Sequence, residues 1–191
     1  MIHDNQPQHD SELTDGSASD FSADNCSNDY LKVGAYDWLH PEWQGEFYPD
    51  DLPEDWQLSY YANEFSVVLV PEARWSAKDL DLQEWSDEVP GNFRFYLQCK
   101  QLPDDTRQEE VKKCLANKLA GFVPEKECKD TETINIVSGV ALIDSSSHAL
   151  REWRVWLESN ASTLNAVFLK DSPLIQKNLH DFKSLVEMLN L

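Results

Sequence analysis

The sequence predicts an α/β fold built on a mainly parallel sheet. Short apolar runs typical of strands alternate along the chain with segments in which apolar residues recur at helical spacing. The run SVVLV (66–70) is continuous, as expected of a strand buried on both faces. Strands separated by helices lie parallel in one sheet. With 191 residues, 41% of them hydrophobic, the chain is large enough for one domain with its own core and a tail.

The elements are predicted in order from Leu31. Residues 31–38 form a short strand that ends at Gly34 or just beyond, and residues 52–65 form a helix with Pro53 in its first turn. The strand 66–70 is followed by a helix over 76–89, for which Ser76 is the candidate N-cap. The next strand covers 93–99.

The pattern continues in the second part of the chain. Residues 106–122 are predicted to form a helix that Gly121 ends. Residues 133–144 are strand-like but broken by Gly139, which predicts a hairpin or a bulged strand. A helix over 145–160, a strand over 164–171 and a helix with apolar residues from Ile175 to Leu189 complete the chain.

Residues 1–30 are predicted to form a disordered acidic tail. They are poor in large apolar side chains and cannot bury enough surface to offset the entropy of ordering. Seven acidic residues precede Lys32, the first base, and the other 28 exceed the 16 bases by 12. An acidic surface repels phosphate backbones and anionic lipid. We therefore expect neither a nucleic acid nor a membrane as partner.

The cysteine pattern and the first residues predict a cytoplasmic protein. The four cysteines show no CxxC spacing, the first ten residues lack the apolar core of a signal peptide, and no apolar run approaches membrane-spanning length. No phosphate-binding glycine motif and no nucleophile-elbow motif occurs in the sequence. We expect no metal site and no cofactor.

Residues 34–65 resemble the N-terminal signature of the YecE-like family, also called domain of unknown function 72. The resemblance extends over about residues 31–100 and 148–191, whereas 101–147 resemble an insertion or a divergent region. The signature residues in matching order are Gly34, Trp38, Pro41, Trp43, Gly45, Phe47, Tyr48, Pro49, Leu52, Tyr60, Tyr61, Ala62 and Phe65.

The resemblance implies a (βα) barrel, but a truncated one. A complete (β/α)₈ barrel needs about 200 residues or more, and the 31–191 domain has room for about four parallel strands with their helices and the inserted segment. Such a half-barrel leaves open sheet edges, which proteins cover or pair. Either the 133–144 segment or a second copy of the chain could cover them.

Ligands of (βα) barrels bind at the carboxyl ends of the strands, and this rule selects the candidate site residues. Asp37 and Glu72 at adjacent strand ends and the nearby His40 are candidates for acid–base chemistry, or are an incidental pair and a histidine that orders its loop. The candidates for ligand binding are Trp38, Trp43, Arg74 and Lys170. The alternatives are that the tryptophans plug one end of the barrel and that the two cations neutralise neighbouring carboxylates.

Two functions from different classes follow. At the predicted strand ends the polar residues depart from the family pattern, since Ala35–Asp37 replace T-S-G and Lys170 replaces a glutamine. This favours a non-catalytic, shortened domain that acts through protein contacts or self-association. The alternative is an enzyme or a binder of a phosphate ester or sugar, with a strand-end site completed by oligomerisation. Whether the chain is an enzyme stays open at this point.

Overall fold

The fold is described from a computed structural model, which defines residues 30–125, 134–144, 149–170 and 175–191. In these segments the chain forms one curved sheet of seven strands in the order β4-β3-β2-β1-β7-β6-β5. Neighbouring strands run parallel except β5 and β6, which are antiparallel. The strands are β1 Lys32–Tyr36, β2 Val67–Val70, β3 Arg94–Cys99, β4 Leu119–Pro124, β5 Ile134–Val137, β6 Val140–Asp144 and β7 Ala166–Lys170.

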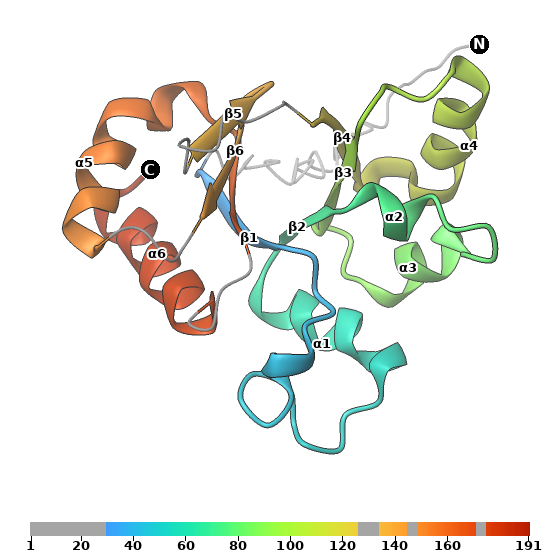
Figure 1. The fold of residues 1–191 in the computed structure, drawn as a ribbon, viewed down its shortest axis with the longest axis horizontal. Coiled ribbons are helices and arrows are strands. Elements are labelled where there is room, and N and C mark those ends of the chain that lie inside the picture. The colour runs from blue at the N-terminus through green and yellow to red at the C-terminus, as the bar shows by residue number, and fades with distance from the viewer. Residues whose placement is uncertain (1–29, 126–133, 145–148, 171–174) are drawn as a thin grey trace, which may run out of the picture.

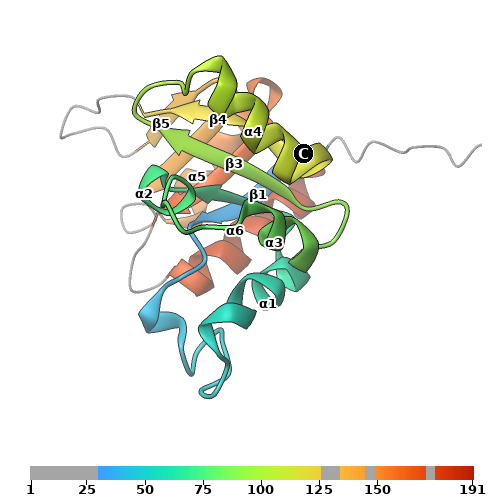
Figure 2. The same cartoon turned by 90° about the vertical axis from the view of Figure 1, so that its right-hand side faces the viewer.

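The helices surround the outer, convex face of the sheet, so that the described part of the chain has the shape of a nearly closed barrel (Figures 1 and 2). α5 and α6 cover the side formed by β6 and β7, and α1 to α4 cover the side formed by β1 to β4. None of these helices is long and apolar enough to span a membrane. The helices are α1 Gln57–Glu64, α2 Glu72–Trp75, α3 Leu82–Glu88, α4 Asp105–Leu115, α5 Leu150–Asn160 and α6 Ile175–Leu189.

The two faces of the sheet carry different cores. Side chains alternate between the faces along each strand, and the outer set packs under the helices in one large cluster that includes Ala35, Val68, Phe95 and Val167, all fully buried. The inner, concave face holds a smaller cluster. Its buried members are Val67, Leu69, Val123, Val140, Ala166 and Phe168.

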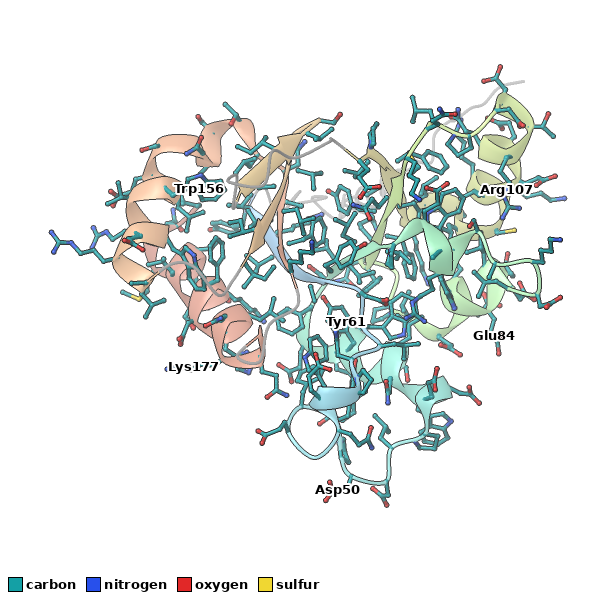
Figure 3. The ribbon with its side chains drawn as sticks, in the orientation of Figure 1. Asp50, Tyr61, Glu84, Arg107, Trp156 and Lys177 are labelled. Atoms are coloured by element: carbon teal, nitrogen blue, oxygen red, sulfur yellow. The ribbon has the colours of Figure 1, made fainter. Side chains whose placement is uncertain are left out.

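The Tyr61 side chain of α1 fastens the second half of β1 to the start of β2. It is fully buried near the centre of the molecule (Figure 3), where its hydroxyl donates to the Val67 carbonyl at 2.9 Å and accepts from the Ala35 N–H at 2.8 Å. Burial raises the pKa of Tyr61 far above its usual range, which keeps the hydroxyl protonated. Gly34 lies beside this bridge, and a Cβ there would overlap the Val67 carbonyl oxygen.

The α/β barrel-like fold class is confirmed, as is the hairpin predicted over 133–144. β5 and β6 pair from Val137↔Val140 outward, and the turn between them has positive φ at Ser138 (53°) and Gly139 (75°). β6 then continues the sheet in parallel beside β7. The hairpin therefore extends the sheet beyond β7, on the side where the half-barrel would otherwise have ended.

The helix predicted over 106–122 is wrong in its second half. α4 ends at Leu115, and the chain then forms β4, which pairs in parallel with β3. Ala116 is the residue that ends the helix, because its φ of 48° lies outside the helical region. With β4 and β6, the parallel part of the sheet has six strands rather than the predicted four or so.

The helix predicted over 76–89 is shorter than expected. α3 begins at Leu82, and its N-cap is Asp81, whose carboxylate accepts from the Gln83 N–H at 2.9 Å. Ser76 instead follows the single turn α2. The remaining predicted helices are present as α1, α5 and α6. Residues 1–29 of the predicted tail lie outside the described residues, and the division into a tail and a 31–191 domain stays a prediction.

Candidate functional site

Asp37 directly follows β1, and its carboxylate orders the loop behind this strand. Its Oδ1 accepts from the Trp38 N–H at 2.8 Å, and its Oδ2 accepts from Nε and Nη2 of Arg74 at 2.9 and 2.7 Å. Asp37 has a φ of 68°, a conformation that Asp tolerates better than most residues. The Arg74 guanidinium also lies 5.3 Å from the Trp38 ring centroid, a favourable cation–π distance. Asp37, Arg74 and Trp38 thus form one structural cluster.

His40 and Trp43 pack against each other in the same loop, which follows β1. His40 is buried, and in the tautomer with the proton on Nε2 this nitrogen donates to the Tyr36 carbonyl at 3.0 Å. The other ring nitrogen, Nδ1, lies 3.7 Å from the Glu42 carboxylate. The Trp43 ring lies 4.3 Å from the His40 ring, and only 2% of Trp43 is exposed. Both residues therefore have the geometry of loop ordering and packing.

Glu72 lies in the first turn after β2, on α2. Its Oε2 accepts from the backbone N–H of Lys100 at 2.8 Å, and the neighbouring Trp75 donates from Nε1 to the Gln98 carbonyl at 2.6 Å. These two bonds fasten α2 to the end of β3. Desolvation raises the pKa of the buried Cys99 thiol, and the negative charge of Glu72 raises it further.

The two carboxylates predicted as an acid–base pair thus have different partners. Asp37 faces Arg74, and Glu72 faces the end of β3. In the described segments no group of three or more His, Cys, Asp or Glu side chains is arranged to hold a metal ion. The roles predicted for Asp37, Glu72 and His40 remain untested hypotheses, and their contacts are those of residues that hold loops.

A different set of side chains lies where a barrel binds ligands, on the concave face near the carboxyl ends of the strands. The Tyr36 hydroxyl donates to Gln98 Oε1 at 2.8 Å across β2. Tyr96 packs edge-on against Phe168, with ring centroids 5.2 Å apart. Lys170 ends β7 in the same alternation as Phe168, and its side chain is exposed. These five residues, which we call the concave-face set, combine aromatic surface with polar groups.

The two phenols of the concave-face set are weaker acids than a free tyrosine side chain. Desolvation raises the pKa of Tyr36, and the negative charges of Glu125 and Asp37 raise it further. Desolvation also raises the pKa of Tyr96, although Arg94 acts in the opposite direction. Both hydroxyls therefore stay protonated at neutral pH and can donate or accept hydrogen bonds, which suits binding.

Lys170 alone of the concave-face set was a sequence-predicted site residue. Tyr36, Tyr96 and Gln98 were missed because they appeared to be ordinary residues of predicted strands. The signal that identifies them is alternation. Val67 and Leu69 of β2 face inward, and they lie in register with Arg94 and Tyr96 of β3, so the inward positions of β3 are Arg94, Tyr96 and Gln98.

Replacing Asp37 by alanine is expected to lower the free energy of unfolding by about 2–3 kcal/mol. The change leaves the half-buried Arg74 guanidinium without its carboxylate and the Trp38 N–H without its acceptor. Asp37→Asn keeps an acceptor and the tolerance of positive φ, and should cost about 1 kcal/mol. Urea unfolding measures both. Equal losses for the two variants would contradict this role for the carboxylate.

Fold and site together define an α/β barrel-like domain whose strand-end carboxylates hold loops and whose concave face carries aromatic and polar side chains. The family model described as "Protein of unknown function DUF72" matches residues 32–127, half of the chain. The chain belongs to this family, as its signature residues predicted. The match includes 101–127, which the sequence analysis assigned to an insertion or a divergent region.

Two solved structures are similar to this chain. One is a DUF72 family protein from Thermotoga maritima MSB8, with 11% identity, a TM-score of 0.49 and coverage of 83% of this chain and 99% of that chain. The other is a DUF72 family protein from Enterococcus faecalis V583, with 9% identity, a TM-score of 0.49 and coverage of 82% and 95%. A search of curated proteins gave no significant match.

Proposed function

We propose that this DUF72 chain is a non-catalytic domain that acts through protein contacts, and that its first partner is a second copy of itself. The observation that carries the proposal is the engagement of the strand-end carboxylates. Asp37 holds Arg74 and the Trp38 N–H, and Glu72 holds the Lys100 N–H. Carboxylates that accept such bonds secure the fold and are poorly placed to transfer protons to a ligand.

The sheet edge at β4 supports contact with another chain. β4 pairs with β3 on one side, and no described strand pairs with its other side. The strand is apolar in sequence and only Val123 of its six residues is buried. The edge strands β4 and β5 lie across the opening of the curved sheet from one another (Figure 1). An unpaired, apolar edge strand is a template for pairing with another strand.

A second copy of the chain can pair with this edge through the same strand, β4, so that no other segment is needed for the contact. Two β4 strands related by a two-fold axis run antiparallel, and each contributes the same residues to the contact. The net charge of −19 per chain opposes this approach. Because salt screens charges at the surface, we expect the dimer to gain stability as ionic strength rises.

Pairing through β4 is tested by a substitution that places a positive charge on this edge strand. Ala120 is the second residue of β4 and is exposed, so Ala120→Lys should leave folding within about 0.5 kcal/mol of the original chain. A lysine on an edge strand opposes strand pairing, and we expect sedimentation velocity to show the monomer only. Gln101→Lys, an exposed position beyond β3, adds the same charge and should leave the dimer intact. A dimer that survives Ala120→Lys would refute the β4 contact.

The concave-face set favours a second candidate, a small polar ligand bound at the carboxyl ends of the strands. Tyr36 and Gln98 offer a hydroxyl and an amide, and Tyr96 and Phe168 offer ring surface. Saturable NMR shifts of Gln98 and Tyr96 on addition of a sugar or a phosphate ester would favour this candidate over the first.

A further inference from the structure

A hollow in the described part of the chain lies at the opposite end of the sheet, where the strands begin. It has a volume of about 520 Å³, which is within the range of small-molecule sites. Its walls come from the start of β1, the segments before β2 and β3, and the last turns of α6. It shares no residue with the concave-face set and is independent of the function proposed above.

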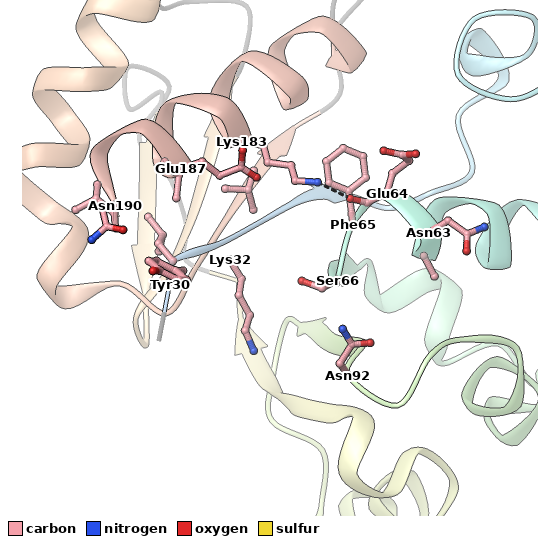
Figure 4. A pocket seen from close by; sticks show the side chains of 15 residues that line it. Tyr30, Lys32, Asn63, Glu64, Phe65, Ser66, Asn92, Lys183, Glu187 and Asn190 are labelled. Atoms are coloured by element: carbon pink, nitrogen blue, oxygen red, sulfur yellow. Dashed lines mark hydrogen bonds between the residues drawn. The ribbon is translucent and has the colours of Figure 1, made fainter. Parts of the chain in front are cut away.

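Polar donors from three strands converge at this hollow. The side chains of Lys32, Ser66 and Asn92, at the starts of β1, β2 and β3, face the same space (Figure 4). Within the described residues, none of the three side chains has a hydrogen bond or an ion pair, although Lys32 is only partly exposed. An ammonium, a hydroxyl and an amide are donors suited to an anionic oxygen.

A second cation stands across the hollow. The Lys183 ammonium donates to the Glu64 carbonyl at 2.9 Å and lies 5.5 Å from the Phe65 ring centroid. The carboxylates of Glu64 and Glu187 also line the hollow, but both residues are exposed, whereas Lys32 and Lys183 are partly buried. The two lysines are therefore less exposed than the two carboxylates, in a chain with a net charge of −19.

Arg94 of β3 adds a further positive charge near the starts of the strands. Arg94 lies in register with Val67, on the inner face of the sheet. Its Nη1 donates to the carbonyls of Gly91 and Phe93, both at 2.8 Å, which fixes the guanidinium near the start of the strand. Lys32 and Arg94 thus place two positive charges on the inner face of β1 and β3.

The remaining wall is apolar. Phe65, Val33, Ala62 and Val186 line the hollow beside the donors. A ligand that contacts both the polar donors and the apolar wall carries one anionic group and one apolar or aromatic body. We propose that this hollow binds a small organic anion, with a carboxylate or phosphate group at Lys32, Ser66 and Asn92 and an apolar body against Phe65 and Val186.

The test uses phenyl phosphate, benzoate and phenol as probes of the full chain in isothermal titration calorimetry. Phenyl phosphate and benzoate should bind saturably, and their ratio tells which anionic group the site prefers. Neutral phenol should bind at least about tenfold more weakly than the better anion, since one charged hydrogen bond is worth about that factor. Phenol binding as tightly as both anions would overturn the proposal.

A matched pair of variants tests the role of Lys32. Lys32→Met keeps the length of the side chain and removes its charge, and should weaken binding of the better anion by about tenfold. Lys78→Met removes the same charge from an exposed position between α2 and α3 and should leave the affinity within about twofold. Equal affinities for Lys32→Met and the original chain would overturn the proposal.

An NMR titration of the unmodified chain tests the location without any substitution. The better anion should shift the amide signals of Ser66 and Asn92 and leave those of Tyr36 and Gln98 unchanged. Shifts confined to Tyr36 and Gln98 would move the ligand to the concave face and refute the site at the strand starts.

Discussion

Replacing Trp43 by alanine is expected to lower the free energy of unfolding by about 3–5 kcal/mol, the usual cost of deleting a large buried aromatic side chain. Trp43 is 2% exposed, and its ring lies 4.3 Å from His40, 5.2 Å from Phe47 and 5.7 Å from Tyr48. The substitution removes the centre of this aromatic cluster, and the loop cannot collapse without moving α1. Chemical denaturation followed by circular dichroism measures the loss.

Trp56 supplies the matched control within the same region. It precedes α1 and is 65% exposed, so Trp56→Ala should change the free energy of unfolding by no more than about 0.5 kcal/mol. Trp43→Phe should lie between the two, because it keeps ring packing and removes an indole N–H that is buried without a partner among the described residues. Similar losses for Trp43→Ala and Trp56→Ala would show that the aromatic cluster does not hold the loop.

Replacing Gly34 by alanine is expected to cost about 3 kcal/mol or more, the upper end for adding a methyl group to a packed interior. The new Cβ would overlap the Val67 carbonyl oxygen and lie 3.0 Å from the carbonyl carbon. A carbonyl cannot rotate away as a side chain can, so β1 and β2 must separate. This movement also breaks the Tyr61 hydroxyl bridge between Ala35 and Val67.

Gly91 provides the control for the alanine substitution. A Cβ at Gly91 meets nothing within 4 Å, and Gly91→Ala is expected to stay within about 0.5 kcal/mol of the original chain or to stabilise it slightly. Thermal unfolding of both variants measures the difference. A Gly34→Ala protein as stable as Gly91→Ala would mean that β1 and β2 are not held at this separation.

The strands with continuous or alternating apolar residues could be predicted from sequence, because their burial leaves a direct pattern. β2, whose four residues are all buried, and β3, which alternates between buried and partly exposed residues, are the clearest cases. The hairpin over 133–144 was predictable because Gly139 interrupts an apolar run at the position where the turn requires positive φ.

β4 could not be predicted, because local sequence and tertiary structure disagree there. Leu115, Leu119 and Phe122 continue the apolar spacing of α4, and Ala116, which ends the helix at a φ of 48°, is the best helix former by propensity. Pairing with β3 decides the conformation of the segment instead. Helix propensity is worth too little per residue to compete with pairing in a parallel ladder.

The candidate residues could be placed at the strand ends from sequence, but the partners of their side chains could not be predicted. The sequence predicts that Asp37 and Glu72 each follow a strand, and parallel pairing brings the carboxyl ends of these two strands together. The direction of each side chain, however, depends on the local backbone conformation. The positive φ of Asp37 aims its carboxylate at Arg74. The concave-face set required the register between strands, which a single sequence does not provide.

The most direct test of the proposed function is the solution mass of the full chain, measured by light scattering after size exclusion at low and high salt. The proposal predicts a mass of about twice the 22.0 kDa of one chain, with a dimer fraction that rises as salt screens the charge of −19. A mass of one chain at every concentration and salt would contradict self-association. In that case a different protein would have to be sought as the partner.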